Sequence, residues 1–138
     1  MLNTAQLSEG SSEDDVSHTP VGLEDVYAAH EVIRERLAYT PLVSHPLLSQ
    51  SLGCAAQVKL ENTHAIGSFK IRGGLNLLAL MPAMERLRGL VTATRGNHGQ
   101  SLAFAAKLYD VPCTIFVPEG NNKDKNAAMA ALGANVVV

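Results

Sequence analysis

The 138-residue sequence is poor in cysteine and in metal-binding patterns. Its two cysteines, Cys54 and Cys113, lie far apart and form no CxxC pair. We therefore expect two free thiols in the protein core, as is usual in a reducing compartment. The five histidines are scattered without the spacing of metal ligands, so we expect no metal site.

The sequence also has a small net charge and no long hydrophobic run. The formal net charge is −2 and no basic patch stands out, which argues against a nucleic-acid partner or an anionic membrane surface. No apolar stretch approaches the length of a membrane helix, and the N-terminus lacks the basic and apolar regions of a secretory signal. We expect a cytoplasmic protein with no membrane partner.

The composition is that of a globular protein, with 46% hydrophobic and 17% charged residues. Residues 1–18 are polar and acidic and cannot bury enough apolar area to offset the cost of ordering, so we expect a flexible tail there. Residues 19–138 form one folded region of single-domain size. The sequence ends in the apolar run Val136–Val138, which resembles a buried strand, and we therefore expect an incomplete domain.

Hydrophobic periodicity and turn residues predict alternating helices and strands. An apolar stripe between Leu23 and Leu37 predicts a first helix, and residues 43–52 resemble a connection with a short helical turn. Alternation from Val58 onward favours an α/β fold with a parallel sheet flanked by helices. The predicted strands cover residues 56–61, 90–94, 112–117 and 134–138, and the predicted helices cover residues 69–81, 82–87, 100–108 and 123–132.

Lys70 follows the predicted N-cap Ser68, in the first turn of a predicted helix. The positive end of a helix disfavours an ammonium there and so favours a free, nucleophilic amine, suited to Schiff-base chemistry with an aldehyde. Gly73-Gly74 is costly within a helix and indicates a close approach to its backbone. The alternative is a surface lysine whose stem bends into water.

A second loop, residues 92–100, joins a predicted strand to a helix. Its glycines, Gly96 and Gly99, permit a tight turn with exposed N–H groups at a helix start, which can bind phosphate or carboxylate. Thr94, Asn97 and His98 can add side-chain donors. Taken alone, the turn fits a purely structural role equally well, because the full dinucleotide-binding glycine pattern is missing.

Together the two loops resemble a known family. Ser68–Gly73 is similar to the SFKxRG motif of fold-type II pyridoxal-phosphate enzymes, and Gly96–Gln100 is similar to their GNHxQ loop. Leu23–Ala29, Thr40–Leu42 and Val58–Asn62 resemble segments of threonine dehydratases and serine racemases. The resemblance covers residues 22–138 and identifies the chain as the N-terminal portion of a threonine/serine dehydratase (threonine ammonia-lyase) type of enzyme.

The resemblance implies pyridoxal 5′-phosphate as cofactor, held by Lys70 as an internal aldimine. The freed Lys70 amine would then move protons at the substrate α-carbon, Phe69 would pack near the pyridine ring, and Asn97 would hydrogen-bond its phenolic oxygen. The implied substrate carboxylate contacts are Thr94, Gly96, Asn97 and His98. The family's phosphate-binding glycine loop and the residue facing the pyridine nitrogen would fall beyond Val138, and the resemblance implies a homo-oligomer at full length.

The implied reaction converts L-threonine, L-serine or a related 3-hydroxy amino acid into a 2-oxo acid and ammonia. Arg95 stands where serine racemases have a serine that acts as a base, so elimination is favoured over racemisation. Arg95 adds charge that suits a carboxylate-bearing substrate, such as a hydroxyaspartate.

Three alternatives remain open from the sequence. The chain could belong to another fold-type II enzyme, catalysing racemisation or β-replacement. It could be a non-catalytic anion- or nucleotide-binding α/β module, in which Glu119 would hold a ribose and Lys70 would be incidental. It could also be an inactive remnant of a longer protein.

Overall fold

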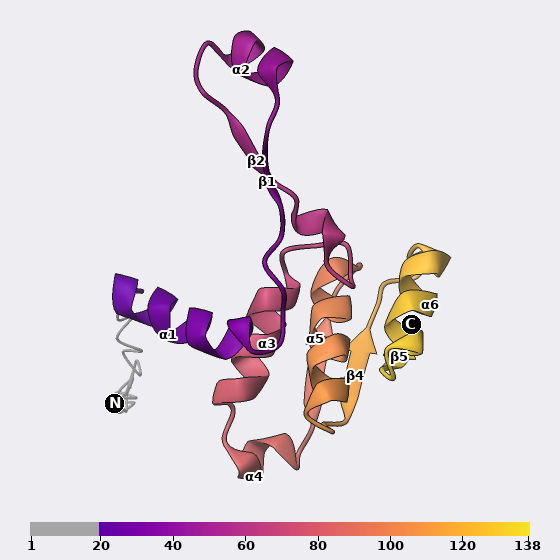
Figure 1. The fold of residues 1–138 in the computed structure, drawn as a ribbon. Coiled ribbons are helices and arrows are strands. Elements are labelled where there is room, and N and C mark those ends of the chain that lie inside the picture. The colour runs from indigo at the N-terminus through magenta and orange to yellow at the C-terminus, as the bar shows by residue number, and fades with distance from the viewer. Residues whose placement is uncertain (1–19) are drawn as a thin grey trace, which may run out of the picture.

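The computed structural model describes residues 20–138, and the predicted flexible tail, residues 1–18, lies outside this range. Helices and strands alternate along most of the described chain (Figure 1). The elements are α1 (Leu23–Arg34), β1 (Leu42–Ser44), α2 (Pro46–Leu52), β2 (Gln57–Lys59), the 3-10 helix η1 (Glu61–Thr63), α3 (Ile71–Leu80), α4 (Ala83–Arg86), β3 (Leu90–Ala93), α5 (Asn97–Leu108), β4 (Cys113–Phe116), α6 (Lys123–Ala131) and β5 (Asn135–Val137).

A three-stranded parallel sheet with the order β3-β4-β5 forms the centre of the fold. Leu90 pairs with Cys113 and Thr114 pairs with Asn135, so each strand lies beside the next along the chain. The crossovers are α5, which packs on both strands that it connects, and α6, which packs on β5 and on α5. The predicted parallel sheet with flanking helices is confirmed.

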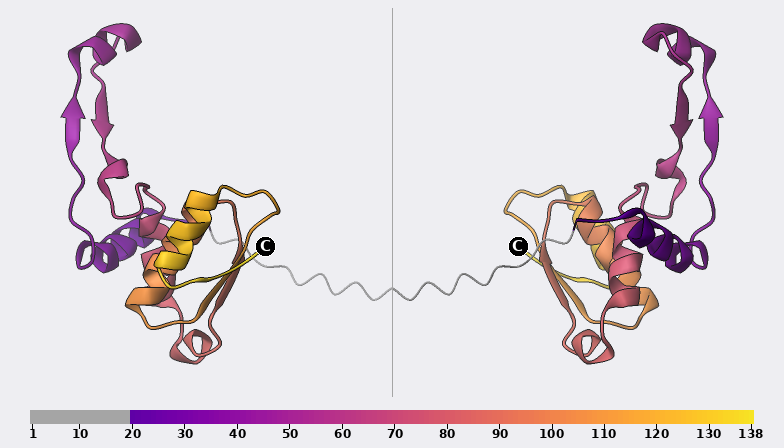
Figure 2. Two further views of the ribbon diagram at one scale, coloured as in Figure 1. Left: turned by 90° about the vertical axis from the view of Figure 1, so that its right-hand side faces the viewer. Right: turned by 90° about the vertical axis from the view of Figure 1, so that its left-hand side faces the viewer.

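The prediction that the strand around Val58 begins this parallel sheet is wrong. β2 instead pairs antiparallel with β1, with Leu42 opposite Lys59, and the two strands form a separate ribbon. β1 lies in the segment expected to be a connection, because alternation along one strand does not specify its partner. The ribbon and α2 project from the rest of the molecule, as Figures 1 and 2 show.

The core lies between α3, α5 and the sheet. Ile71, Leu75 and Leu78 recur at helical spacing on α3 and are fully buried. They face α5, whose small side chains let the two helices pack side by side (Figure 1). The buried alanines of α5 are Ala103, Ala105 and Ala106.

Gly74 marks the closest approach of α3 to α5. A Cβ atom at Gly74 would lie 2.5 Å from the carbonyl oxygen of Ser101, whereas a Cβ atom at Gly73 would meet nothing within 4 Å. The close approach predicted from the glycine pair is therefore found at Gly74. Gly73 leaves the helix surface open on the side of the cavity described below.

Capping residues fix both ends of α6. The side-chain oxygen of Asn122 accepts a hydrogen bond from the backbone N–H of Lys125 at 3.0 Å. Gly133 follows the helix with a φ of 95°, and the N–H of Ala134 returns to the carbonyl of Met129 at 3.2 Å. This arrangement is typical of a glycine-terminated helix.

The two cysteines differ from the expectation of a pair of core thiols. Both are free, but only Cys113, in β4, is buried, and this burial raises the pKa of its thiol. Cys54 is exposed because it lies at the end of the projecting ribbon, directly after the left-handed Gly53 that terminates α2. Within residues 20–138, no helix combines the length and apolar character needed to cross a bilayer.

Candidate active site

Lys70 lies at the start of α3, where its backbone is fixed by three hydrogen bonds. Its N–H donates to the Ser68 hydroxyl at 3.3 Å, and its carbonyl accepts from the Ser101 hydroxyl at 2.5 Å and from the Gly74 N–H at 3.3 Å. α3 begins at Ile71, two residues later than expected. Its N-cap is Lys70, without a side-chain cap, so the prediction of Ser68 as N-cap is wrong.

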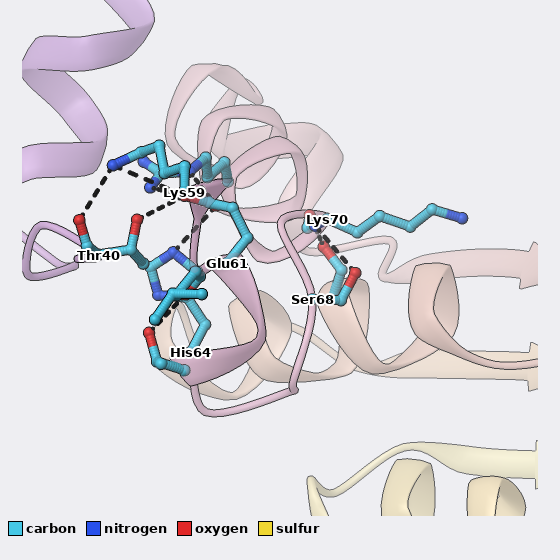
Figure 3. Close-up of polar contacts among 10 residues, drawn as sticks. Thr40, Lys59, Glu61, His64, Ser68 and Lys70 are labelled. Carbon is cyan, nitrogen blue, oxygen red and sulfur yellow. Dashed lines mark hydrogen bonds and ion pairs between the residues drawn. The ribbon is translucent and has the colours of Figure 1, made fainter. Parts of the chain in front are cut away.

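The Lys70 side chain is exposed and extends away from the cluster of polar residues around Glu61 (Figure 3). No acidic group among residues 20–138 lies within ion-pair distance of its ammonium. An amine without a carboxylate partner is free to react with an aldehyde once it is deprotonated.

A mostly apolar cavity of about 390 Å³ opens beside Lys70, between α3 and α5. His98, in the first turn of α5, borders the same cavity, so the two sequence motifs meet in one cleft. The cavity is lined by Phe69, Lys70, Arg72, Gly73, Gly74, Leu77, His98 and Leu102. Its volume lies within the range of about 300–1,000 Å³ that is common for small-molecule sites.

The turn that follows β3 presents N–H groups at the start of α5. The N–H of Thr94 pairs with the Phe116 carbonyl at 3.0 Å, and the Thr94 hydroxyl accepts from the Gly96 N–H at 3.3 Å. The first N–H groups of α5, beginning at Asn97, have no intrahelical acceptors and point toward the helix start. This geometry suits a bound anion.

Gly99 is needed because α6 and β4 pack against it. A Cβ atom there would lie 2.6 Å from the Thr94 methyl carbon and 3.3 Å from Cδ1 of Ile115, and it would also overlap the sulfur of Met129. The start of α5 is therefore packed closely against β4 and α6.

The predicted site residues fall into two groups. Phe69, Lys70 and His98 line the cavity between the helices. Thr94 and Gly96 lie in the adjoining turn, and Asn97 is the first residue of α5, which begins three residues earlier than expected. None of these three residues is part of the cavity wall. The roles assigned to all six residues remain predictions about the site with its ligands.

Sequence reasoning missed a polar cluster centred on Glu61. Nε and one terminal nitrogen of Arg72 donate to the two Glu61 carboxylate oxygens, each at 2.8 Å, and the Thr40 hydroxyl donates to the carboxylate at 2.7 Å. Lys59 donates to the Thr40 carbonyl at 3.2 Å, and Nε2 of His64 lies 3.3 Å from Glu61 Oε2. Figure 3 shows Thr40, Lys59 and His64 gathered around Glu61.

The cluster ties the base of the ribbon to the first turn of α3. The hydrogen bonds from Arg72 lower the pKa of Glu61 from 4.5 to about 2, so the carboxylate stays charged over the whole neutral and mildly acidic range. Arg72 lies only two residues after Lys70, so the pair also restrains the segment that carries Lys70. Glu61 and Arg72 lie within two of the segments that carry the family resemblance, Val58–Asn62 and Ser68–Gly73. No pattern in the sequence predicts that their side chains form an ion pair.

Ser101 is a second residue that the sequence did not single out. Its side chain is buried, and its hydroxyl donates to the Lys70 carbonyl while accepting from the Gly74 N–H at 3.2 Å. One side chain of α5 thus fixes the start of α3. A serine within a helix gives no indication of this role, because such residues more often bond to their own helix.

Comparison with known proteins places this architecture in a family. The family model described as pyridoxal-phosphate dependent enzyme matches residues 33–138. The chain belongs to this family. The predicted cofactor, pyridoxal 5′-phosphate, follows from that membership, and the alternative of a nucleotide-binding module without catalysis is superseded.

Curated relatives of this pyridoxal-phosphate enzyme chain differ in reaction. It is 38% identical over 82% of its length to an L-threonine ammonia-lyase of Geobacter sulfurreducens, covering 28% of that protein. It is 36% identical over 82% of its length to an L-threo-3-hydroxyaspartate ammonia-lyase of Saccharomyces cerevisiae, and 41% identical over 85% to a serine racemase of Homo sapiens, covering 35% of each. The chain thus spans about a third of the length of these relatives.

Solved structures give the same assignment. The serine racemase of Dictyostelium discoideum superposes with a TM-score of 0.80 at 35% identity, over 85% of this chain and 38% of that one. The family and the fold-type II architecture are therefore established, whereas ammonia-lyases and racemases both remain among the relatives.

Proposed function

We propose that the chain forms part of a pyridoxal-phosphate-dependent ammonia-lyase that acts on a 3-hydroxy amino acid of the serine or threonine type. The observation that carries the proposal is the shared cavity between α3 and α5. It brings the Lys70 amine and the start of α5 to one cleft of suitable size.

The donor set around the cavity fits the cofactor. Lys70 offers an amine without an acidic partner among residues 20–138, and Phe69 and Leu77 offer apolar surface for a flat ring. Gly73 has no side chain and lines the cavity, so the surface of α3 stays open there to a ligand. When bound, pyridoxal phosphate supplies an electron sink for a negative charge that develops at the substrate α-carbon.

Lys70 is the residue proposed to hold the cofactor and, once displaced by substrate, to take the α-proton. Its backbone is fixed by Ser68 and Ser101, so only the flexible stem moves between these two tasks. A lysine amine is suited to proton transfer because it can act as a base when neutral and as an acid when charged.

The turn between β3 and α5 is proposed to bind the substrate carboxylate. Its free N–H groups and the side chains of Thr94, Asn97 and His98 can fix the carboxylate and so orient the α-hydrogen toward Lys70. Asn97 is also proposed to donate to the phenolic oxygen of the cofactor ring.

In the proposed elimination, the α-proton passes to Lys70 and the β-hydroxyl leaves as water after taking up a proton. The resulting enamine rearranges to an imine, which adds water and releases ammonia and a 2-oxo acid. Arg95 supports elimination over racemisation, because a guanidinium stays protonated and cannot serve as a base on the second face of the α-carbon.

The proposal is tested by assaying the complete natural chain, loaded with cofactor, for release of ammonia and a 2-oxo acid from 3-hydroxy amino acids. Lys70→Ala is expected to lower kcat by at least about a thousandfold, since it removes both attachment and proton transfer. Lys107→Ala, at the far end of α5, is the matched control and is expected to keep activity. Formation of D-amino acids without ammonia release would contradict the proposal and assign racemisation instead.

A further inference from the structure

The Ser101 hydroxyl of α5 bridges the first helical hydrogen bond of α3. It donates to the Lys70 carbonyl at 2.5 Å and accepts from the Gly74 N–H at 3.2 Å, while the same N–H lies 3.3 Å from the Lys70 carbonyl. Ser101 is only 1% exposed, so its hydroxyl has no access to water as an alternative partner. The backbone of Lys70 therefore takes its position in part from α5.

The start of α5 is packed on two opposite sides. On one side, a Cβ atom added to Gly99 would overlap the sulfur of Met129 and would lie 3.3 Å from Cδ1 of Ile115. Ser101 comes two residues later and faces the other way, because successive residues of an α-helix are rotated by about 100°. There its backbone carbonyl would lie 2.5 Å from a Cβ atom at Gly74 of α3. This part of α5 therefore cannot shift without moving the start of α3.

The groups proposed to bind the substrate carboxylate lie on the same part of α5. The free N–H groups begin at Asn97, which lies one helical turn before Ser101, and His98 borders the cavity between these two residues. An anion held by these N–H groups would restrict the motion of the first turn of α5. Because Ser101 begins the next turn, that restriction reaches the Lys70 carbonyl through a single hydroxyl.

We propose that Ser101 is a positioning residue that couples the two halves of the site. A carboxylate at the start of α5 would then strengthen cofactor binding at Lys70, and the cofactor would strengthen carboxylate binding by the same factor, because coupling between sites is reciprocal. This inference rests on the proposed function, which assigns the substrate carboxylate to the start of α5. Ser68 provides no such connection, because its hydroxyl contacts the Lys70 N–H from within the same loop.

The test measures the affinity of the complete natural chain for pyridoxal phosphate with and without saturating propionate, at an ionic strength kept constant with chloride. Propionate carries a carboxylate but no amino group, so it does not displace Lys70 from the cofactor. It is expected to tighten cofactor binding by about tenfold in the wild-type protein, a typical factor for two coupled sites. Ser101→Ala is expected to reduce this factor to less than about twofold, because the connection to the Lys70 carbonyl is lost.

Ser68→Ala is the matched control. It removes the other side-chain contact with the Lys70 backbone but leaves α5 connected to α3, so the coupling factor is expected to stay near the wild-type value even if cofactor affinity falls. An equal loss of coupling in Ser68→Ala and Ser101→Ala would overturn the inference, since any weakening of the turn at Lys70 would then suffice.

The remaining outcomes separate the inference from the proposed function. Propionate that binds the wild-type protein without changing cofactor affinity, or a coupling factor that survives Ser101→Ala, would overturn the inference and leave the proposed function intact. Absence of propionate binding to the wild-type protein would instead reject the carboxylate site on which the proposed function depends, and the inference with it.

Discussion

Glu61 lies outside the cavity but restrains the segment that carries Lys70. Its carboxylate is held by Arg72 and Thr40, and through Arg72 it reaches the first turn of α3. Bidentate arginine–carboxylate pairs have a fixed planar geometry, which makes them effective restraints on neighbouring backbone. The restraint acts on the segment that carries Lys70.

Glu61→Gln is expected to lower the free energy of unfolding by about 2 kcal/mol near neutral pH, because it removes hydrogen bonds to a charged carboxylate and leaves Arg72 unpaired. The pKa of Glu61 falls from 4.5 to about 2 on folding, so its contribution is complete above pH 4.5 and is lost as the pH falls toward 2. Denaturant unfolding of both proteins as a function of pH measures this difference.

Glu85→Gln is the matched control, since Glu85 is exposed in α4 and makes no ion pair within residues 20–138. It is expected to change stability by less than about 0.5 kcal/mol. A difference between wild type and Glu61→Gln that stays constant down to pH 2 would contradict the role given to the Glu61 charge.

Ser101 acts at the same scale through a different contact. Its buried hydroxyl bridges the Lys70 carbonyl and the Gly74 N–H, so α5 is tied to the residue that is proposed to carry the cofactor. Buried polar groups are stable only when they are paired, and here both partners belong to the start of α3. The Ser101 hydroxyl thus connects α5 to the start of α3, and these two helices border the cavity that Lys70 lines.

At the scale of elements, the contact between α3 and α5 determines the shape of the cavity. The two helices approach closely at Gly74, while Gly73 on the neighbouring face stays open to the cavity. The glycine pair therefore has two separate purposes, close packing and access. This division leads to opposite expectations for two adjacent substitutions.

Gly74→Ala is expected to lower the free energy of unfolding by about 1–3 kcal/mol, because its methyl group would overlap the backbone of Ser101. Gly73→Ala is expected to raise it by up to about 1 kcal/mol, because alanine is the better helix former and its methyl group meets nothing within 4 Å. Denaturant titration of both variants measures the contrast. Equal destabilisation by both would show that α3 and α5 are not in the contact described.

The sequence predicted some of these elements well and others only in part. The cap at Asn122 and the glycine at position 133 fix α6 locally, so its bounds could be read from neighbouring residues. The pairing of β2 with β1 depends on contacts between residues about fifteen positions apart, and the alternating pattern does not encode them. The Glu61–Arg72 pair escaped prediction for the same reason.

At the scale of the whole molecule, the parallel sheet brings together chemistry from distant parts of the chain. Lys70 and His98 are widely separated in sequence, and they meet because α3 packs on the crossover helix α5. The two motifs could be recognised singly, but their common cleft follows only from the packing of the helices. Cofactor attachment and substrate binding are proposed to share that cleft.

The most direct test of this account is the site at which the cofactor attaches. The complete chain is incubated with pyridoxal phosphate and reduced with borohydride, and the modified lysine is located by peptide mass spectrometry. Residues 1–138 contain five lysines, and Lys70 alone is expected to carry the reduced cofactor at stoichiometric amounts. Stable modification of any other lysine in its place would contradict the assignment of Lys70 as the cofactor-bearing residue.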